Sequence, residues 1–141
     1  MTISGTMRKL LRVREMEEEQ SRAALERALS EQKRLEAALE EAKRRERKGK
    51  ELLAESAFTG ELTDRVAGIE EIRTAERHAG GLKARLGGAE QVVELRRQEM
   101  RARRIERLRV ETLITRRQEE EAVETERRAQ RDLDDWFLQR W

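Results

Sequence analysis

Residues 72–100 of the chain read IRTAERHAGGLKARLGGAEQVVELRRQEM. Apolar residues recur in this stretch at alternating intervals of three and four. The repeat consists of Ile72, Ala75, Ala79, Leu82, Leu86, Ala89, Val93, Arg96 and Met100, of which Arg96 is the only polar member. This spacing places all nine on one narrow stripe of an α-helix, which is the pattern of a helix that packs against a single partner helix. The stretch therefore predicts a coiled coil.

The composition favours paired helices over a compact domain. Charged residues make up 44% of the 141 residues and aromatic residues 3%, and proline is absent. Typical globular domains contain about 25% charged residues, so this chain has too few large apolar side chains to cover a compact core. Disordered chains are usually rich in proline and lack periodicity. Long helices that pack along narrow stripes are the economical alternative.

A first helix is expected over about residues 4–57, with Ser4 as its N-cap. A seven-residue frame places apolar side chains on one face of this helix: Met7, Leu11, Leu25, Ala28, Leu35, Leu39, Ala42 and Leu53. The same frame also contains polar or small residues: Arg14, Glu18, Ser21, Gln32, Glu46 and Gly49. The stripe is thus imperfect, as expected for a face that packs on one partner and is not fully buried.

A turn is expected over about residues 58–63, followed by a second helix over about 64–140. Gly60 suits the end of the first helix, and Thr59 or Thr63 suits the cap of the second. After residue 100 the apolar stripe is expected to shift, as it does at a stutter in a coiled coil. The shifted stripe contains Ile105, Leu108, Thr112, Ala122, Ala129, Leu133 and Trp136.

Two glycine pairs, at residues 80–81 and 87–88, offer a second possible turn. Each glycine costs a helix interior about 1 kcal/mol relative to alanine. Folding about either position brings arginine-rich runs beside glutamate-rich runs, so charge does not decide between the two turns. The apolar stripe continues past both pairs, which favours a soft or closely approached helical stretch over a loop. We therefore predict an all-α fold for residues 1–141, a long antiparallel two-helix coiled-coil hairpin with its turn near Gly60.

Residues that carry catalysis or bind cofactors are nearly absent. Cysteine is missing, and the one histidine, His78, has no second histidine with which to hold a metal. The glycine pairs lack the lysine of a phosphate-binding loop. The sequence therefore predicts no catalytic residues, no cofactor and no metal, with His78 as a solvated residue on a helix surface.

Charge and hydropathy also argue against binding to nucleic acid or to membranes. The 32 basic and 30 acidic residues leave a net charge of only +2. The basic run at residues 43–48 could contact nucleic acid, but no aromatic residues lie beside it for base stacking. No apolar run approaches the length of a membrane span. We expect a cytoplasmic protein that does not bind nucleic acid and does not insert into a membrane.

Three of the four aromatic residues lie close together near the end of the sequence, namely Trp136, Phe137 and Trp141. With Leu133 they recur at helical spacing and form one apolar stripe. An exposed apolar patch of this kind is usually a docking surface. The alternative is that the tryptophans pack against the N-terminal turn or against a second copy of the chain.

Both ends of the chain resemble the FliJ/YscO family. Residues 7–15, MRKLLRVRE, are similar to the leucine-bearing helix with which these proteins open. Residues 126–135, ERRAQRDLDD, resemble their closing arginine-rich helix, with Asp135 in place of the usual glutamate. The resemblance covers the whole chain as two unequal helices. Trp136, Phe137 and Trp141 depart from the alanine-rich flagellar ending and lean toward the injectisome branch.

This resemblance implies a stalk protein of a type III export apparatus, flagellar or virulence-associated. Members of the family are cytoplasmic and insert into a hexameric export ATPase, and they also contact the export gate and in some cases export chaperones. By analogy, the residues that enter the ATPase ring would be Met7, Leu10, Leu11, Leu133, Asp134, Asp135, Trp136, Phe137, Arg140 and Trp141. The alternative is a generic cytoplasmic coiled-coil scaffold that homodimerises through its apolar stripe.

Overall fold

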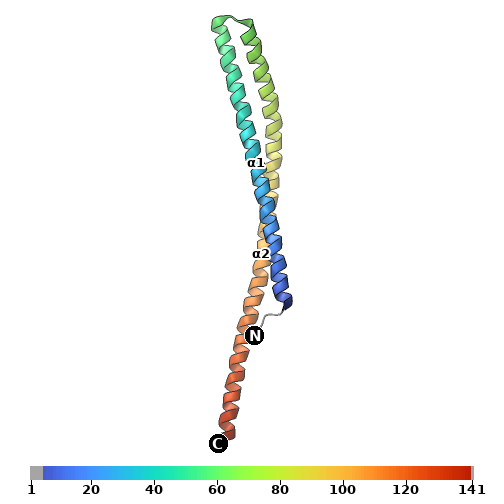
Figure 1. Ribbon diagram of the computed structural model, residues 1–141, viewed down its shortest axis with the longest axis vertical. Coiled ribbons are helices and arrows are strands. Elements are labelled where there is room, and N and C mark those ends of the chain that lie inside the picture. Colours follow the sequence, from blue (N-terminus) through green and yellow to red (C-terminus); the bar gives the residue numbers. More distant parts are fainter. Residues whose placement is uncertain (1–4, 141) are drawn as a thin grey trace. The chain divides into compact units, whose positions relative to one another are not determined.

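The computed structural model describes residues 5–140, and these form two helices that pack against each other. Helix α1 spans Gly5–Thr59 and helix α2 spans Leu62–Arg140 (Figure 1). Residues 5–140 contain no strand. The predicted all-α hairpin is confirmed. The described residues divide into two compact units. Residues 23–98 form the turn unit, and residues 5–22 with 99–140 form the terminal unit.

The chain reverses at Gly60, inside the range expected from the sequence. Gly60 has a φ of 70°, and its N–H donates to the carbonyl of Ser56 at 2.8 Å. This is the αL arrangement that commonly ends a helix and that glycine adopts without strain. The Glu61 N–H donates to the Thr59 hydroxyl at 3.4 Å. Thr63 lies inside α2, so the expectation that it caps this helix is wrong.

The core of the turn unit follows the predicted heptad frame. Leu35, Leu39 and Ala42 of α1 form one buried cluster with Ala79 and Leu82 of α2. Partly buried apolar residues pack against this cluster, namely Ala38, Leu86 and Ala89. Leu35 and Leu86 therefore lie in one cluster, as a turn at Gly60 requires.

Close to the turn, the two helix backbones approach each other through small residues. A Cβ atom added to Gly68 would lie 2.9 Å from the Gly49 carbonyl oxygen and 3.0 Å from the Leu53 nitrogen. A Cβ added to Gly49 would lie 3.0 Å from the Gly68 carbonyl oxygen. Ser56, one heptad after Gly49, is fully buried, and its hydroxyl donates to the Leu53 carbonyl at 2.7 Å. Gly49 is thus a contact point between backbones and not a defect in the stripe.

The four glycines at residues 80–81 and 87–88 lie within α2, which continues through both pairs. All four are exposed, and a Cβ added to any of them would meet no described atom within 4 Å. The alternative turn at these positions is therefore wrong. The closely approached backbone lies instead at Gly49 and Gly68.

In the terminal unit the heptad frame of α2 continues past Met100 without a shift. Val110 and Ile114 are buried at the positions that this frame predicts. Ile105 and Leu108, members of the shifted stripe, are 49% and 44% exposed. The predicted stutter is wrong because Arg103 and Arg107 occupy the frame positions between Met100 and Val110.

These arginines pack against the polar frame positions of α1. Arg107 donates through Nε to Glu18, whose side chain is only 7% exposed, and through a guanidinium nitrogen to Glu111 at 2.7 Å. Hydrogen bonds to Glu18, and next to Glu111, raise the pKa of Arg107 above its ordinary value. Arg22 also reaches Glu18, at 3.4 Å. Glu18 is thus a buried carboxylate held between two cations.

A second group of charges extends this contact. Arg14 lies 3.0 Å from Glu17 and 3.4 Å from Glu106, and Arg103 lies 3.5 Å from Glu17 and 3.2 Å from Glu106. We call the whole set the ionic layer; it consists of Arg14, Glu17, Glu18, Arg103, Glu106 and Arg107. Within the terminal unit, this layer sets residues 14–18 of α1 against 103–107 of α2.

Candidate partner-docking site

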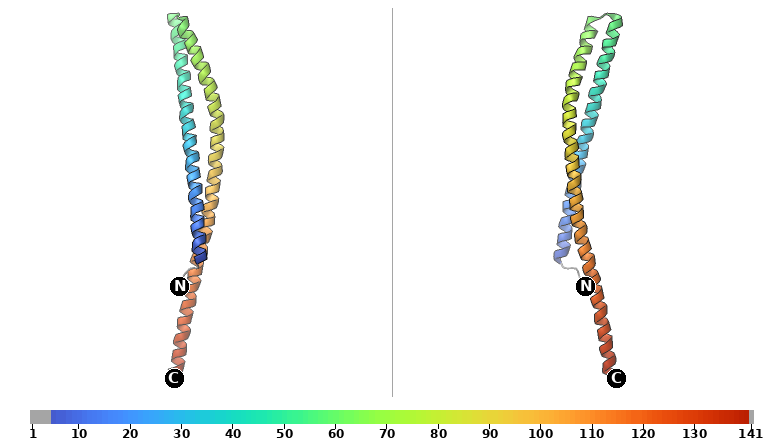
Figure 2. Two further views of the ribbon diagram at one scale, coloured as in Figure 1. Left: turned by 45° about the vertical axis from the view of Figure 1, so that its right-hand side comes forward. Right: turned by 180° about the vertical axis from the view of Figure 1, so that it is seen from behind.

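The last turns of α2 carry an aromatic surface that residues 5–22 of α1, in the same unit, do not cover. Leu133, Trp136, Phe137 and Arg140 recur at intervals of three and four residues and therefore share one helix face. The three apolar side chains are between 47% and 50% exposed. Both views of Figure 2 show this final, red part of α2 extending past the blue start of α1. We call these four residues the aromatic end.

Contacts within the aromatic end hold its side chains in place. The Trp136 and Phe137 rings meet edge to face, with centroids 5.3 Å apart and planes at 84°. The guanidinium carbon of Arg140 lies 4.5 Å from the centre of the Trp136 ring. Both geometries are favourable for a quadrupolar ring. The surface is therefore partly ordered before any partner binds, which lowers the entropy lost on docking.

The two aspartates of the predicted site lie on different sides of α2. The Asp134 carboxylate accepts a hydrogen bond from the Gln130 amide at 3.0 Å. Helical periodicity sets Asp134 on the flank of the stripe beside Phe137, whereas Asp135 lies on the side opposite Leu133. Both are exposed. A partner that covers the aromatic end would therefore meet Asp134 before Asp135.

The N-terminal residues expected at the same site lie elsewhere. The register of the ionic layer sets Met7 and Leu11 beside the buried residues Val110 and Ile114 of α2. Along the axis of α2, Leu133 lies about 28 Å beyond Ile114, because each helical residue rises by about 1.5 Å. Met7 and Leu11 therefore lie apart from the aromatic end, and the expectation that they and Leu10 enter an ATPase ring stays a prediction. Met7 and Leu11 are half-buried on the face toward α2, and Leu10 is exposed.

Trp141, which the sequence assigns to the site, lies outside the described residues. Phe58, which the sequence reading passes over, is 94% exposed beside the turn. Phe58 lies in the last turn of α1 and off the heptad frame, so a search for periodic apolar residues does not find it.

No three His, Cys, Asp or Glu side chains among residues 5–140 lie close enough to hold a metal ion. His78 is exposed on α2, as expected. Neither α1 nor α2, over its described length, contains an apolar segment able to cross a lipid bilayer.

Comparison with protein-family models found no match to this chain. Comparison with curated proteins and with solved structures likewise found none.

Proposed function

We propose that this protein is a non-enzymatic stalk component of a type III protein export apparatus, flagellar or virulence-associated. In this proposal it acts in the cytoplasm, and the aromatic end of α2 docks into a hexameric export ATPase. The observation that carries the proposal is the half-exposed stripe Leu133, Trp136 and Phe137, which has no covering partner among residues 5–140. The resemblance of residues 7–15 and 126–135 to the FliJ/YscO family supports it. Further contacts with the export gate and with export chaperones are part of the same proposal.

The length of α2 beyond its last buried contact limits the surface that would enter the ATPase ring to a single helix. A coiled-coil hairpin presents two helices along most of its length, but the aromatic end lies about 28 Å beyond the last buried contact of α2 with α1. The docking element is therefore a single helix, with Trp136 and Phe137 as anchors and Arg140 beside them. Large aromatic side chains are enriched among the residues that dominate binding energies. Met7 and Leu11 contribute indirectly, by holding α1 on α2.

The first test of this proposal is the variant Trp136→Ala. Its affinity for the ATPase hexamer is expected to fall about 30-fold, corresponding to about 2 kcal/mol for a tryptophan hot spot. The melting temperature should hardly change, because the ring contacts of Trp136 are with Phe137 and Arg140 on the same helix end. Affinity is measured by isothermal titration calorimetry with the purified hexamer, and melting by circular dichroism.

The matched control is Phe58→Ala, which removes an even more exposed aromatic residue beside the turn. This variant should bind the hexamer as the wild type does. Equal losses for Phe58→Ala and Trp136→Ala would indicate nonspecific hydrophobic adhesion. A wild-type chain that does not bind the hexamer at all would favour the generic scaffold instead.

The two aspartates provide a second, independent test. Asp134→Lys is expected to weaken hexamer binding about tenfold if the ring presents basic groups beside Phe137, and raised salt should weaken the wild-type complex as well. Asp135→Lys makes the same charge change on the opposite side of α2 and should have a smaller effect. Equal effects of the two substitutions would show that the ring surrounds α2 completely and does not select one face.

A further inference from the structure

Two glycine pairs leave one stretch of α2 almost without side chains on its outer face. All four residues of the pairs are exposed, namely Gly80, Gly81, Gly87 and Gly88. Ala84, which lies between the pairs on the same face, is exposed as well and adds only a methyl group. A Cβ atom added to any of the four glycines would meet no described atom within 4 Å. Packing between the helices therefore does not require glycine at these positions.

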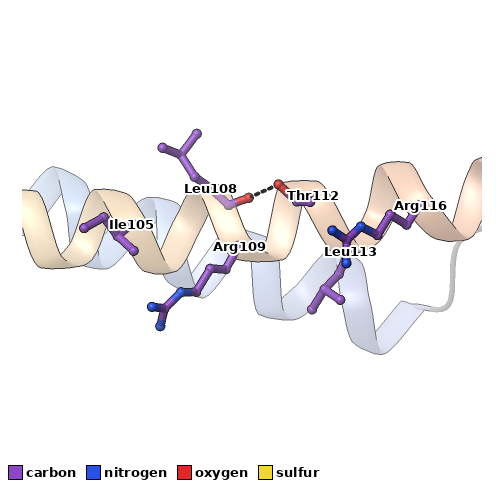
Figure 3. Close-up of a pocket in the computed structure, with 6 residues that line it drawn as sticks. All are labelled: Ile105, Leu108, Arg109, Thr112, Leu113 and Arg116. Atoms are coloured by element: carbon purple, nitrogen blue, oxygen red, sulfur yellow. Dashed lines mark hydrogen bonds between the residues drawn. The ribbon is translucent and has the colours of Figure 1, made fainter.

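The outer face of α2 in the terminal unit is built differently. Figure 3 shows larger side chains there, among them Ile105, Leu108 and Arg109. On the same face the Thr112 hydroxyl donates to the Leu108 carbonyl at 2.8 Å (Figure 3). Glycine, in contrast, leaves the helix backbone exposed to water. The backbone of α2 is thus less shielded at the glycine pairs than at residues 105–112.

Glycine also weakens the helical backbone itself. Relative to alanine, each glycine lowers the equilibrium constant for the helical state about fivefold, because glycine loses more conformational freedom. Four of the nine residues 80–88 are glycine, so the combined factor is on the order of several hundred if the effects add in free energy. No ion pair joins two side chains of residues 78–91, a stretch that the structure describes in full. Side-chain pairing therefore does not offset the loss.

The segment of α1 that packs on this stretch is stabilised along its own length. Leu35 and Leu39 of α1 share a buried cluster with Leu82 of α2. Ion pairs between residues three or four apart lie in and around this segment: Glu31 with Arg34 at 2.6 Å, Glu41 with Arg44 at 3.2 Å, and Glu46 with Lys50 at 3.2 Å. Pairs at these intervals stabilise a helix without help from a partner helix. Residues 80–88, in contrast, depend on packing against α1 for their helical structure.

We propose that residues 80–88 of α2 form a joint, a segment that opens locally while α1 and the flanking parts of α2 stay folded. Local openings of this kind occur where the backbone is exposed and intrinsic stability is low. An open joint lets α2 bend at residues 80–88, while the facing segment of α1 remains a continuous helix. The turn unit would then consist of one stiff helix and one helix that bends. The proposal does not depend on the stalk function, because it uses no residue of the aromatic end.

Hydrogen exchange, measured residue by residue by NMR on the full-length chain, tests this proposal. The amides of residues 82–86 are expected to be protected about 100-fold less than those of residues 35–43 of α1. Their exchange should depend only weakly on low concentrations of urea, because a local opening exposes little surface. Replacing all four glycines with alanine leaves residues 82–86 themselves unchanged. In this variant the difference in protection between the two segments should fall below about threefold.

The matched control is Lys83→Ala with Arg85→Ala, which adds alanine to the same exposed segment but keeps the four glycines. This control should retain the difference in protection, because lysine, arginine and alanine have similar helix propensities. Equal protection of residues 82–86 and 35–43 in the wild type would overturn the proposal. An equally steep dependence on urea for both segments would overturn it too, because residues 82–86 would then exchange only by global unfolding. A difference that survived replacement of the glycines, or that the control also removed, would show that the glycines do not cause the opening.

Discussion

Replacing Gly80, Gly81, Gly87 and Gly88 with alanine is expected to raise the free energy of unfolding by up to about 4 kcal/mol. Each replacement in a helix interior contributes up to about 1 kcal/mol from propensity alone. All four positions are exposed, and a Cβ atom at any of them would meet no described atom within 4 Å. The gain in propensity is therefore not offset by a clash.

The same substitution at Gly68 is expected to have the opposite effect. Its new Cβ would lie 2.9 Å and 3.0 Å from backbone atoms of Gly49 and Leu53, which cannot rotate away as a side chain can. Forced overpacking typically costs about 1 to 3 kcal/mol, and more where backbones must separate. We therefore expect Gly68→Ala to lower the free energy of unfolding by about 2 kcal/mol after the propensity gain.

Urea unfolding followed by circular dichroism measures both effects on one chain. The slope of unfolding against urea should stay constant, so that midpoint shifts report stability. If Gly68→Ala were as stabilising as Gly80→Ala, the close approach of the two backbones near the turn would be contradicted. A quadruple variant that lost its helical signal would show that residues 80–88 need a non-helical backbone.

The sequence predicted the turn unit well, since apolar residues occupy nearly every frame position there. Leu35, Leu39 and Leu82 lie in the core at the positions expected from their spacing. The role of Gly49 was missed because a search for apolar residues counts glycine as a gap. The signal available was the recurrence of small residues at intervals of seven, at Ala42, Gly49 and Ser56.

The terminal unit was harder to predict because charges occupy its frame positions. Arg103 and Arg107 continue the heptad of α2, but a search for apolar residues moves instead to Ile105 and Leu108 on the outer face. The signal that identifies the true frame is pairing: Glu18 fills a polar frame position of α1 opposite Arg107. The same search joins Leu133 and Trp136 of the aromatic end to Ile105 and Leu108 in one stripe, although none of these four residues is buried against α1.

Lysine in place of Glu18 is expected to lower the free energy of unfolding by about 3 kcal/mol, as for the loss of one partner of a buried ion pair. The Glu18 side chain is 7% exposed and lies between Arg107 and Arg22. Lysine there would bring a third positive charge into a poorly hydrated contact. Thermal unfolding measured at two salt concentrations should show that salt restores little of the loss, because buried charges are weakly screened.

Glu19→Lys is the matched control, since it changes the neighbouring residue by the same charge. Glu19 is 69% exposed and pairs with Arg22 at 3.1 Å, and exposed pairs of this kind contribute at most about 1 kcal/mol. The charge-swapped variant Glu18→Lys with Arg107→Glu should recover part of the lost stability. Recovery is incomplete because the new carboxylate would lie beside Glu111.

Comparing Glu18→Lys with Glu19→Lys also tests which contacts fix the register of α1 on α2 in the terminal unit. Val110 and Ile114 are the buried apolar residues of α2 here, and an apolar contact alone tolerates a shift by one heptad. A charged pair at a frame position does not tolerate such a shift, because Glu18 and Arg107 would no longer contact each other. Polar residues at such positions are known to specify the register of a coiled coil. If Glu18→Lys lowered stability no more than Glu19→Lys, water would have free access to this contact, and the ionic layer would not determine the register.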